Sequence, residues 1–471
     1  MNDNEYFDDE EFREILEDYE RAVKSGQPVF MDADDLADIA DYYQLNNRFD
    51  EADQAIDLAL KLQPDSTTAI IYRVRDLINE GKYEEAEATL DKIIERQSPE
   101  YVYTKAEIML AQEKVDEADA YLRECLKDIP PDEYQDYVLD VANLYTDYSY
   151  GDKSMEWMMR AKQENTEDFK ELMARTLFDL GKYKDSERIF NELLDANPFQ
   201  KRYWNALSNV QFMNEDYNAA VTSSEYAIAI DPKDPEAIIS KANGLYRLEN
   251  YEEALKFYIR YSEKVPDDEF GLLHQGMCLI NMGCYQEAAK KLEEAEAVSP
   301  QDSPYISDIC QELAFTYSEL GRTETALSYI GKAWENDADH ADLLVIKGHI
   351  LLHSGDVEAA ETAFKEAFAC SEDSSHTMLR IIVSLYDNQY VESAYEMFQK
   401  YFNLTSRNFD EGYAYMTLCC WDLKRYDEFM HYLKLACEKN PQETRLVLSH
   451  MFPDSVKPQD YYKYMLEKLK N

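Results

Sequence analysis

The chain has 471 residues, and its 96 acidic and 48 basic residues give a formal charge of −48 at pH 7. This charge argues against nucleic acid and anionic membranes as partners, because both are bound through clustered lysine and arginine, and the chain has no such cluster. Hydrophobic residues make up 45% of the chain, enough for a folded core, while 13 glycines and 14 prolines leave little material for long linkers.

The N-terminus and the cysteines both favour a cytoplasmic protein. The first twenty residues hold ten acidic side chains and one basic one, Arg13, which is the opposite of a cationic signal peptide. No apolar run approaches the ~18 residues that a membrane span needs, so we expect no membrane insertion. The eight cysteines form no C-x-x-C pair and are interpreted as small buried hydrophobes in a reducing compartment.

The first predicted element is an amphipathic helix over residues 9–25. Its apolar positions include Phe12, Ile15, Leu16 and Tyr19, and Gly26 ends it. We therefore expect residues 1–32 to form an acidic tail and a capping helix.

A period of 34 residues dominates the rest of the chain. Such a period is typical of stacked helix pairs, because one pair cannot bury its apolar face without a neighbour. Within each unit, small residues let the two helices approach closely, and proline ends the second helix. The period is marked by Tyr183, Tyr217, Tyr251 and Tyr285, by Pro198, Pro232, Pro266 and Pro300, and by Ala220, Ala254 and Ala288.

The unit from Lys201 to Asp234 resembles the tetratricopeptide repeat. Its characteristic residues are Trp204, Leu207, Ser208, Tyr217, Ala220, Ala227 and Pro232. The resemblance implies an all-α fold, an α-solenoid in which antiparallel helix pairs stack into a right-handed superhelix. It also implies a protein-protein interaction module without catalytic activity.

The same register covers nearly the whole chain. It predicts about eight units over 33–302 and about four more over 303–441, after a four-residue insertion from Ser303 to Ile306, with capping helices over 442–471. Glycines at the turn inside a unit are expected to adopt a left-handed conformation. These glycines are Gly81, Gly181, Gly283, Gly321 and Gly355.

In the tetratricopeptide family the inner face of the array holds extended peptides, and this implies a groove in the middle of the chain. Asparagine amides there offer a donor and an acceptor to a peptide backbone, and arginines can take a carboxylate. Alternatively, the asparagines satisfy helix ends and neighbouring groups. The corresponding residues are Arg202, Asn205, Asn209, Phe212, Asn243, Tyr246, Arg247, His274 and Asn281.

Two other zones of the inner face differ in character. In the first four units the equivalent positions are acidic, including Asp41, Glu100 and Glu107, with Arg75 as the main basic residue. Towards the C-terminus they are mostly apolar. An acidic zone of this kind attracts a partner that carries a basic segment.

Three histidines near the C-terminal end of the array indicate either a metal site or ordinary groove histidines. His349 and His353 are one helical turn apart, and His376 begins the next unit, so the three could hold zinc. No H-E-x-x-H motif is present, and the simpler interpretation leads us to expect no metal and no cofactor. Phosphate-binding loops, dinucleotide fingerprints and nucleophile elbows are also missing, so we expect no enzyme.

Two functions remain open at this point. The first is a cytoplasmic scaffold or adaptor that binds an extended segment of a protein partner in its concave groove. The alternative is a chaperone-like or regulatory subunit that holds one enzyme or one unfolded client. The sequence leaves the partner and the oligomeric state open.

Overall fold

The computed structural model describes residues 7, 10–45, 48–162, 165–300, 303–336, 339–404, 410–453 and 455–470. Every regular element in these residues is a helix, which confirms the predicted all-α class. The chain divides into two compact units, residues 1–215 and residues 216–471. No helix among the described residues is both long enough and apolar enough to cross a bilayer.

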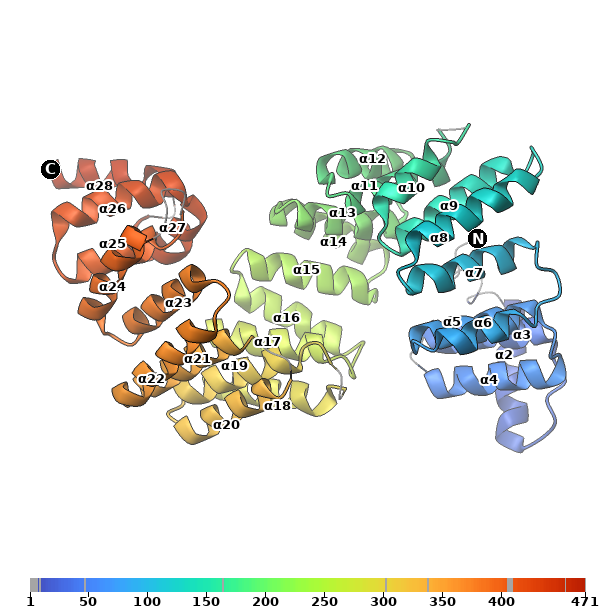
Figure 1. Cartoon of the computed structure of the whole chain (residues 1–471), viewed down its shortest axis with the longest axis horizontal. Helices are drawn as coiled ribbons and strands as arrows, with labels where there is room; N and C mark the ends of the chain where they lie inside the picture. Colours follow the sequence, from blue (N-terminus) through green and yellow to red (C-terminus); the bar gives the residue numbers. More distant parts are fainter. Residues whose placement is uncertain are drawn as a thin grey trace. The chain divides into compact units, whose positions relative to one another are not determined.

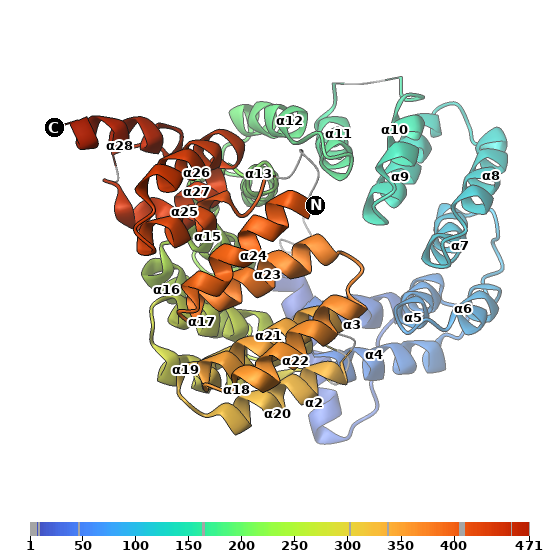
Figure 2. The ribbon, with the colours of Figure 1, turned by 60° about the vertical axis from the view of Figure 1, so that its left-hand side comes forward.

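Unit 1 (residues 1–215) is a stack of five helix pairs, α3 to α12, each joined by a short turn, with α2 before them and α13 after them (Figures 1 and 2). Its helices are α2 (Glu10–Ser25), α3 (Ala33–Leu45), α4 (Phe49–Leu62), α5 (Thr67–Asn79), α6 (Tyr83–Leu90), α7 (Pro99–Ala111), α8 (Val115–Cys125), α9 (Tyr134–Asp147), α10 (Gly151–Met158), α11 (Glu167–Asp179), α12 (Tyr183–Ala196) and α13 (Lys201–Met213), with a 3-10 turn η1 (Leu126–Asp128).

Unit 2 (residues 216–471) continues with the same kind of pair and ends in two extra helices. Its helices are α14 (Tyr217–Ile230), α15 (Pro235–Arg247), α16 (Tyr251–Ser262), α17 (Glu269–Asn281), α18 (Tyr285–Val298), α19 (Ile306–Glu319), α20 (Thr323–Trp334), α21 (His340–His353), α22 (Val357–Cys370), α23 (Ser374–Asp387), α24 (Val391–Leu404), α25 (Tyr413–Asp422), α26 (Tyr426–Lys439), α27 (Pro441–Leu448) and α28 (Tyr461–Lys470), with 3-10 turns η2 (Ser449–Met451) and η3 (Pro458–Asp460).

Small residues bring the two helices of a pair close together, as expected. A Cβ at Gly276 would lie 2.5 Å from Leu292 Cγ, and one at Gly348 would lie 2.2 Å from a ring carbon of Phe364. Ala288 is fully buried. The α-solenoid fold is thus confirmed within each unit, whereas the right-handed superhelix of the whole array stays a prediction.

The turns inside the pairs adopt the left-handed conformation that their glycines predicted. The φ angles are 71° at Gly81, 68° at Gly181, 72° at Gly283, 71° at Gly321 and 86° at Gly355. Where the glycine is missing, other residues take the same conformation despite their Cβ atoms. These are Glu113, Ser149, Glu215, Glu249, Gln389 and Lys424, with φ between 59° and 68°.

Helix α2 precedes the first repeat helices, and α27 and α28 follow the last, where the sequence predicts capping helices; their role as caps stays a prediction. Phe12 and Tyr19 of α2 are 1% and 4% exposed, so this helix buries its apolar face. At the other end, Tyr461 of α28 stacks on Phe452 with ring centroids 3.9 Å apart. The predicted insertion forms a turn before α19, in which Ser303 Oγ donates to Glu269 Oε1 at 2.6 Å.

Candidate peptide-binding groove

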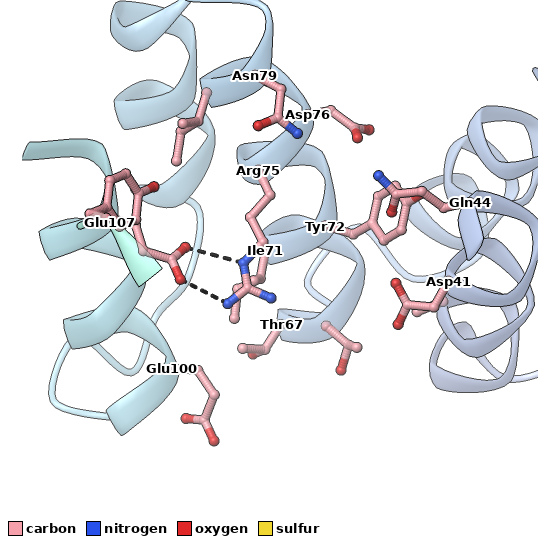
Figure 3. A pocket seen from close by; sticks show the side chains of 14 residues that line it. Asp41, Gln44, Thr67, Ile71, Tyr72, Arg75, Asp76, Asn79, Glu100 and Glu107 are labelled. Carbon is pink, nitrogen blue, oxygen red and sulfur yellow. Dashed lines mark hydrogen bonds and ion pairs between the residues drawn. The ribbon is translucent and has the colours of Figure 1, made fainter. Parts of the chain in front are cut away.

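A pocket of about 390 Å³ opens on one face of unit 1, over the first helices of three consecutive repeats (Figure 3). Helices α3, α5 and α7 supply its walls, and Tyr148, directly after α9, completes it. We call this pocket the acidic groove. It is lined by Ala37, Asp41, Gln44, Thr67, Thr68, Ile71, Tyr72, Arg75, Asp76, Ile78, Asn79, Glu100, Glu107 and Tyr148.

Helix α5, the middle wall, contributes side chains to both the core and the groove. Ile70 and Val74 of α5 are completely buried in the stack. Thr67, Ile71 and Arg75, spaced four residues apart, line the groove instead. Because residues at this spacing share one face of a helix, the alternation of apolar and polar positions directs the polar side chains into the groove.

The 34-residue repeat brings charged side chains together across the groove. Asp41, Arg75 and Glu107 occupy the ninth position of three consecutive repeats. Arg75 makes a two-pronged ion pair with Glu107, with Nε to Oε2 at 3.1 Å and Nη2 to Oε1 at 2.9 Å (Figure 3). Such pairs orient both side chains and use two of the five N–H donors of the guanidinium.

The acidic groove is negative on balance. Its lining holds four carboxylates, those of Asp41, Asp76, Glu100 and Glu107, against the one guanidinium of Arg75. Glu107 already pairs with Arg75, so three carboxylates stay in excess. A cation that enters the groove therefore meets more negative than positive side chains.

Asp76 is the carboxylate of the acidic groove whose ionisation is most affected by burial. Burial raises its pKa to about 6, against the opposing charge of Arg73. Among the described residues, its buried Oδ2 has no hydrogen bond, and Arg73 Nη1 lies 3.5 Å from it. Asp76 therefore keeps its proton to a higher pH than an exposed carboxyl group does.

The structure places four of the nine predicted groove residues on α13 of unit 1. Arg202 Nη2 pairs with Glu171 at 2.8 Å and also donates to Tyr203 Oη. Asn205 is 2% exposed, so its amide lies inside the stack, while Asn209 is exposed and Phe212 is half-buried. The side chains of Arg202 and Asn209 are thus the accessible polar groups of this set.

The other five predicted residues lie in unit 2 and make contacts within it. Asn243 accepts a hydrogen bond from Tyr258 at 2.8 Å. Arg247 donates to Tyr217 Oη at 2.6 Å. These bonds match the alternative that such groups satisfy their neighbours, and a role for the nine residues in partner binding stays a prediction. Further contacts join His274 Nδ1 to the Phe270 carbonyl at 3.0 Å and Asn281 Nδ2 to Tyr246 Oη at 3.4 Å.

A second groove, of about 530 Å³, runs over α17, α19, α21 and α23 in unit 2. Burial raises the pKa of Glu312 to about 7 and that of Asp387 to about 6. Burial, together with the charge of His353, lowers the pKa of His349 to about 4. This groove therefore holds ionisable groups that are poorly solvated.

The histidines of the candidate metal site are only partly brought together. His349 and His353 lie beside Glu319 of α19. His376 lies in the first turn of α23, more than two turns before Ser384, which is the residue of that helix that reaches His349. Sequence reasoning missed Glu319, although it stands exactly one repeat, 34 residues, before His353.

Family models for the tetratricopeptide repeat match residues 36–66, 73–133, 172–235 and 313–375. The chain is a tetratricopeptide repeat protein. A further model, described as anaphase-promoting complex, cyclosome, subunit 3, matches residues 213–295 of this tetratricopeptide repeat protein. Proteins of repeat families of this kind are generally binding modules without catalytic activity.

Curated relatives of this tetratricopeptide repeat protein are distant. It is 23% identical over 289 residues to anaphase-promoting complex subunit 3 of Schizosaccharomyces pombe, covering 59% of this chain and 42% of that protein. It is 30% identical over 92 residues to the protein STIP1 homolog of Dictyostelium discoideum, covering 20% of this chain and 16% of that protein. The match therefore spans less than half the length of either relative.

Among solved structures, a tetratricopeptide repeat protein from Parabacteroides merdae is similar with a TM-score of 0.42 and 15% identity. The similarity covers 53% of this chain and 98% of that one.

Proposed function

We propose that this protein is a scaffold or adaptor without catalytic activity, and that its acidic groove holds an extended, basic segment of a partner protein. The excess of three carboxylates on the walls of one pocket carries this proposal. The cysteines without a C-x-x-C pair support a cytoplasmic location.

The dimensions of the groove suit an extended chain. Neighbouring packed helices are about 8–10 Å apart, so the distance from α3 across α5 to α7 is roughly 20 Å. An extended peptide covers ~3.3 Å per residue, and about six residues would cross the groove. Tyr72, Tyr148, Gln44 and Asn79 add hydroxyl and amide groups that can bond the peptide backbone.

The test uses fluorescein-labelled peptides in which arginine alternates with glycine, compared with the same peptides carrying glutamate. Fluorescence anisotropy should show binding of the arginine peptide alone. The double variant Asp41→Asn, Glu100→Gln should weaken it by about threefold to tenfold, since each partly exposed charge pair contributes roughly 0.2–1 kcal/mol.

A matched control removes two charges elsewhere in unit 1. Glu84→Gln with Glu87→Gln changes exposed residues of α6 that do not line the groove, and alters the net charge equally. Equal loss of affinity in both double variants would show that the peptide responds to overall charge and would overturn the proposal. Binding of the glutamate peptide with similar affinity would do the same.

One observation favours the alternative of a chaperone-like or regulatory subunit. A pocket of about 540 Å³ in unit 2 is lined mainly by apolar side chains, including Phe364, Met378 and Met397. Phe368 at its edge is 46% exposed. A crosslinked pull-down separates the two functions, because a scaffold yields several defined proteins, a regulatory subunit one stoichiometric enzyme, and a holdase a heterogeneous set.

A further inference from the structure

Three metal-ligating side chains converge at the end of the second groove. One carboxylate oxygen of Glu319, one ring nitrogen of His349 and one of His353 all lie within 4.8 Å of one another. His353 Nδ1 and Glu319 Oε1 are 3.4 Å apart. Glu319 ends α19, and both histidines lie in the last two turns of α21.

The repeat explains why these groups meet. Glu319 and His353 hold the thirteenth position of consecutive repeats, so stacking places one beside the other. His349 is four residues before His353 and therefore faces the same side of α21. Asp387 holds the thirteenth position of the next repeat and adds a carboxylate whose pKa, raised mainly by burial, also responds to the charge of Glu319.

Neighbouring residues hold the imidazole and the carboxylate in place. His349 Nδ1 lies 3.2 Å from Ser384 Oγ and 3.2 Å from Asn388 Nδ2. The Asn388 amide nitrogen can only donate to Nδ1, whereas the serine hydroxyl can either donate to it or accept from it. A metal at Nε2 requires the tautomer in which Nδ1 carries the hydrogen and donates it to the serine hydroxyl. Burial, the charge of Glu319 and a hydrogen bond to it raise the pKa of Tyr285, so the Glu319 carboxylate has a hydroxyl partner as well. Hydrogen bonds of this kind orient the ligands of metal sites.

We propose that Glu319, His349 and His353 form a site for a divalent transition metal such as Zn²⁺. Two imidazoles and a carboxylate are a donor set that zinc accepts, with water in the fourth position. Bonds of about 2.0–2.1 Å in a tetrahedron place ligand atoms about 3.4 Å apart. The Glu319 to His353 distance already has this value, and the remaining distances between ligand atoms are at most 4.8 Å.

A bound metal would tie α19 to α21 and thus join two neighbouring repeats. A metal that binds the folded chain alone stabilises it, so thermal stability should rise with metal concentration. The site lies in unit 2, apart from the residues of the acidic groove, and its failure would leave the proposed peptide binding unaffected.

The test is calorimetric titration of the full chain with Zn²⁺ at about pH 7.5, after chelation and with thiols kept reduced by a phosphine. We expect one equivalent to bind with micromolar affinity or tighter, and the melting temperature to rise. Glu319→Gln and His353→Gln should each weaken binding by about tenfold or more. His376→Ala, which changes a histidine outside the cluster, should bind as the wild type does.

Three results would overturn the proposal. The first is no heat of Zn²⁺ binding in the micromolar range. The second is unchanged affinity in both Glu319→Gln and His353→Gln, with circular dichroism showing that they are folded. The third is a thiolate charge-transfer band when Co²⁺ replaces Zn²⁺, which would assign the metal to cysteines such as the exposed Cys370.

Discussion

The helices stacked around a groove determine the exposure and the hydrogen bonds of its single polar side chains. Asn205 and Asn243 look equivalent in sequence, since both are amides on the inner face of a repeat. In the structure Asn205 is 2% exposed, and Asn243 accepts from Tyr258 at 2.8 Å. Burial and bonding partners come from neighbouring helices, and for this reason the type and position of a residue did not reveal them.

Glu312 is a buried carboxyl group whose raised pKa makes the stability of the fold depend on pH. Burial, with a smaller contribution from Asp308, raises its pKa from 4.5 to about 7. Between these two pH values the folded chain keeps a proton that the unfolded chain releases. The free energy of unfolding therefore falls as the pH rises through this window and stays low above it.

We accordingly expect Glu312→Gln to stabilise the protein at about pH 8.5 and to have little effect at about pH 4.5, with a gain on the order of 1–3 kcal/mol. Urea denaturation at both pH values measures the difference. Glu324→Gln, at an exposed position of α20, removes the same charge and serves as the control. A gain that is equal at both pH values would contradict the raised pKa.

At the scale of the elements, the turn between the two helices of a repeat has one residue in the left-handed backbone conformation. Gly283 and Gly321 adopt φ of 72° and 71°, and a Cβ at either would meet nothing within 4 Å. Glu249 takes φ of 62° at the equivalent turn between α15 and α16. The left-handed turn is thus required by the packing of the pair even where the sequence does not offer a glycine.

Replacing Glu249 with glycine should raise the free energy of unfolding by up to about 1 kcal/mol. Relief of about 1–2 kcal/mol of left-handed strain exceeds the added entropy of the unfolded chain. Lys256→Gly, at an exposed position inside α16, should instead lower stability by about 1 kcal/mol. Chemical denaturation compares the two, and a loss of similar size in both variants would contradict the strain.

At the scale of the whole molecule, charge is the dominant property. The chain carries 96 acidic side chains and has a formal charge of −48. The mutual repulsion of these side chains opposes the compact state. Ion pairs such as Arg75 with Glu107 offset only part of this repulsion, since there are half as many basic residues. Added salt should therefore stabilise the fold and weaken the proposed peptide binding.

Raising NaCl from about 20 to about 300 mM should increase the melting temperature by a few degrees, because ions screen the repulsion. Over the same range the affinity for the arginine peptide should fall. Differential scanning fluorimetry and anisotropy measure the two effects, with equal concentrations of uncharged sucrose as a control for solute effects. A melting temperature that is constant or falls with NaCl would contradict net repulsion.

The sequence by itself determined the repeat and the left-handed glycine turns. These features depend on residue size, backbone freedom and periodicity, which are properties of single positions and short spacings. It also placed Asp41, Arg75 and Glu107 on one face, because they share a repeat position.

Only the tertiary structure decided which of these side chains stay accessible and which meet. It added Asp76 and Tyr148 to the acidic groove, and it brought Glu319 rather than His376 to the two histidines. The physical reason is that burial and side-chain contacts depend on helices one repeat away in the stack. Local spacing along the chain carries little information about those neighbours.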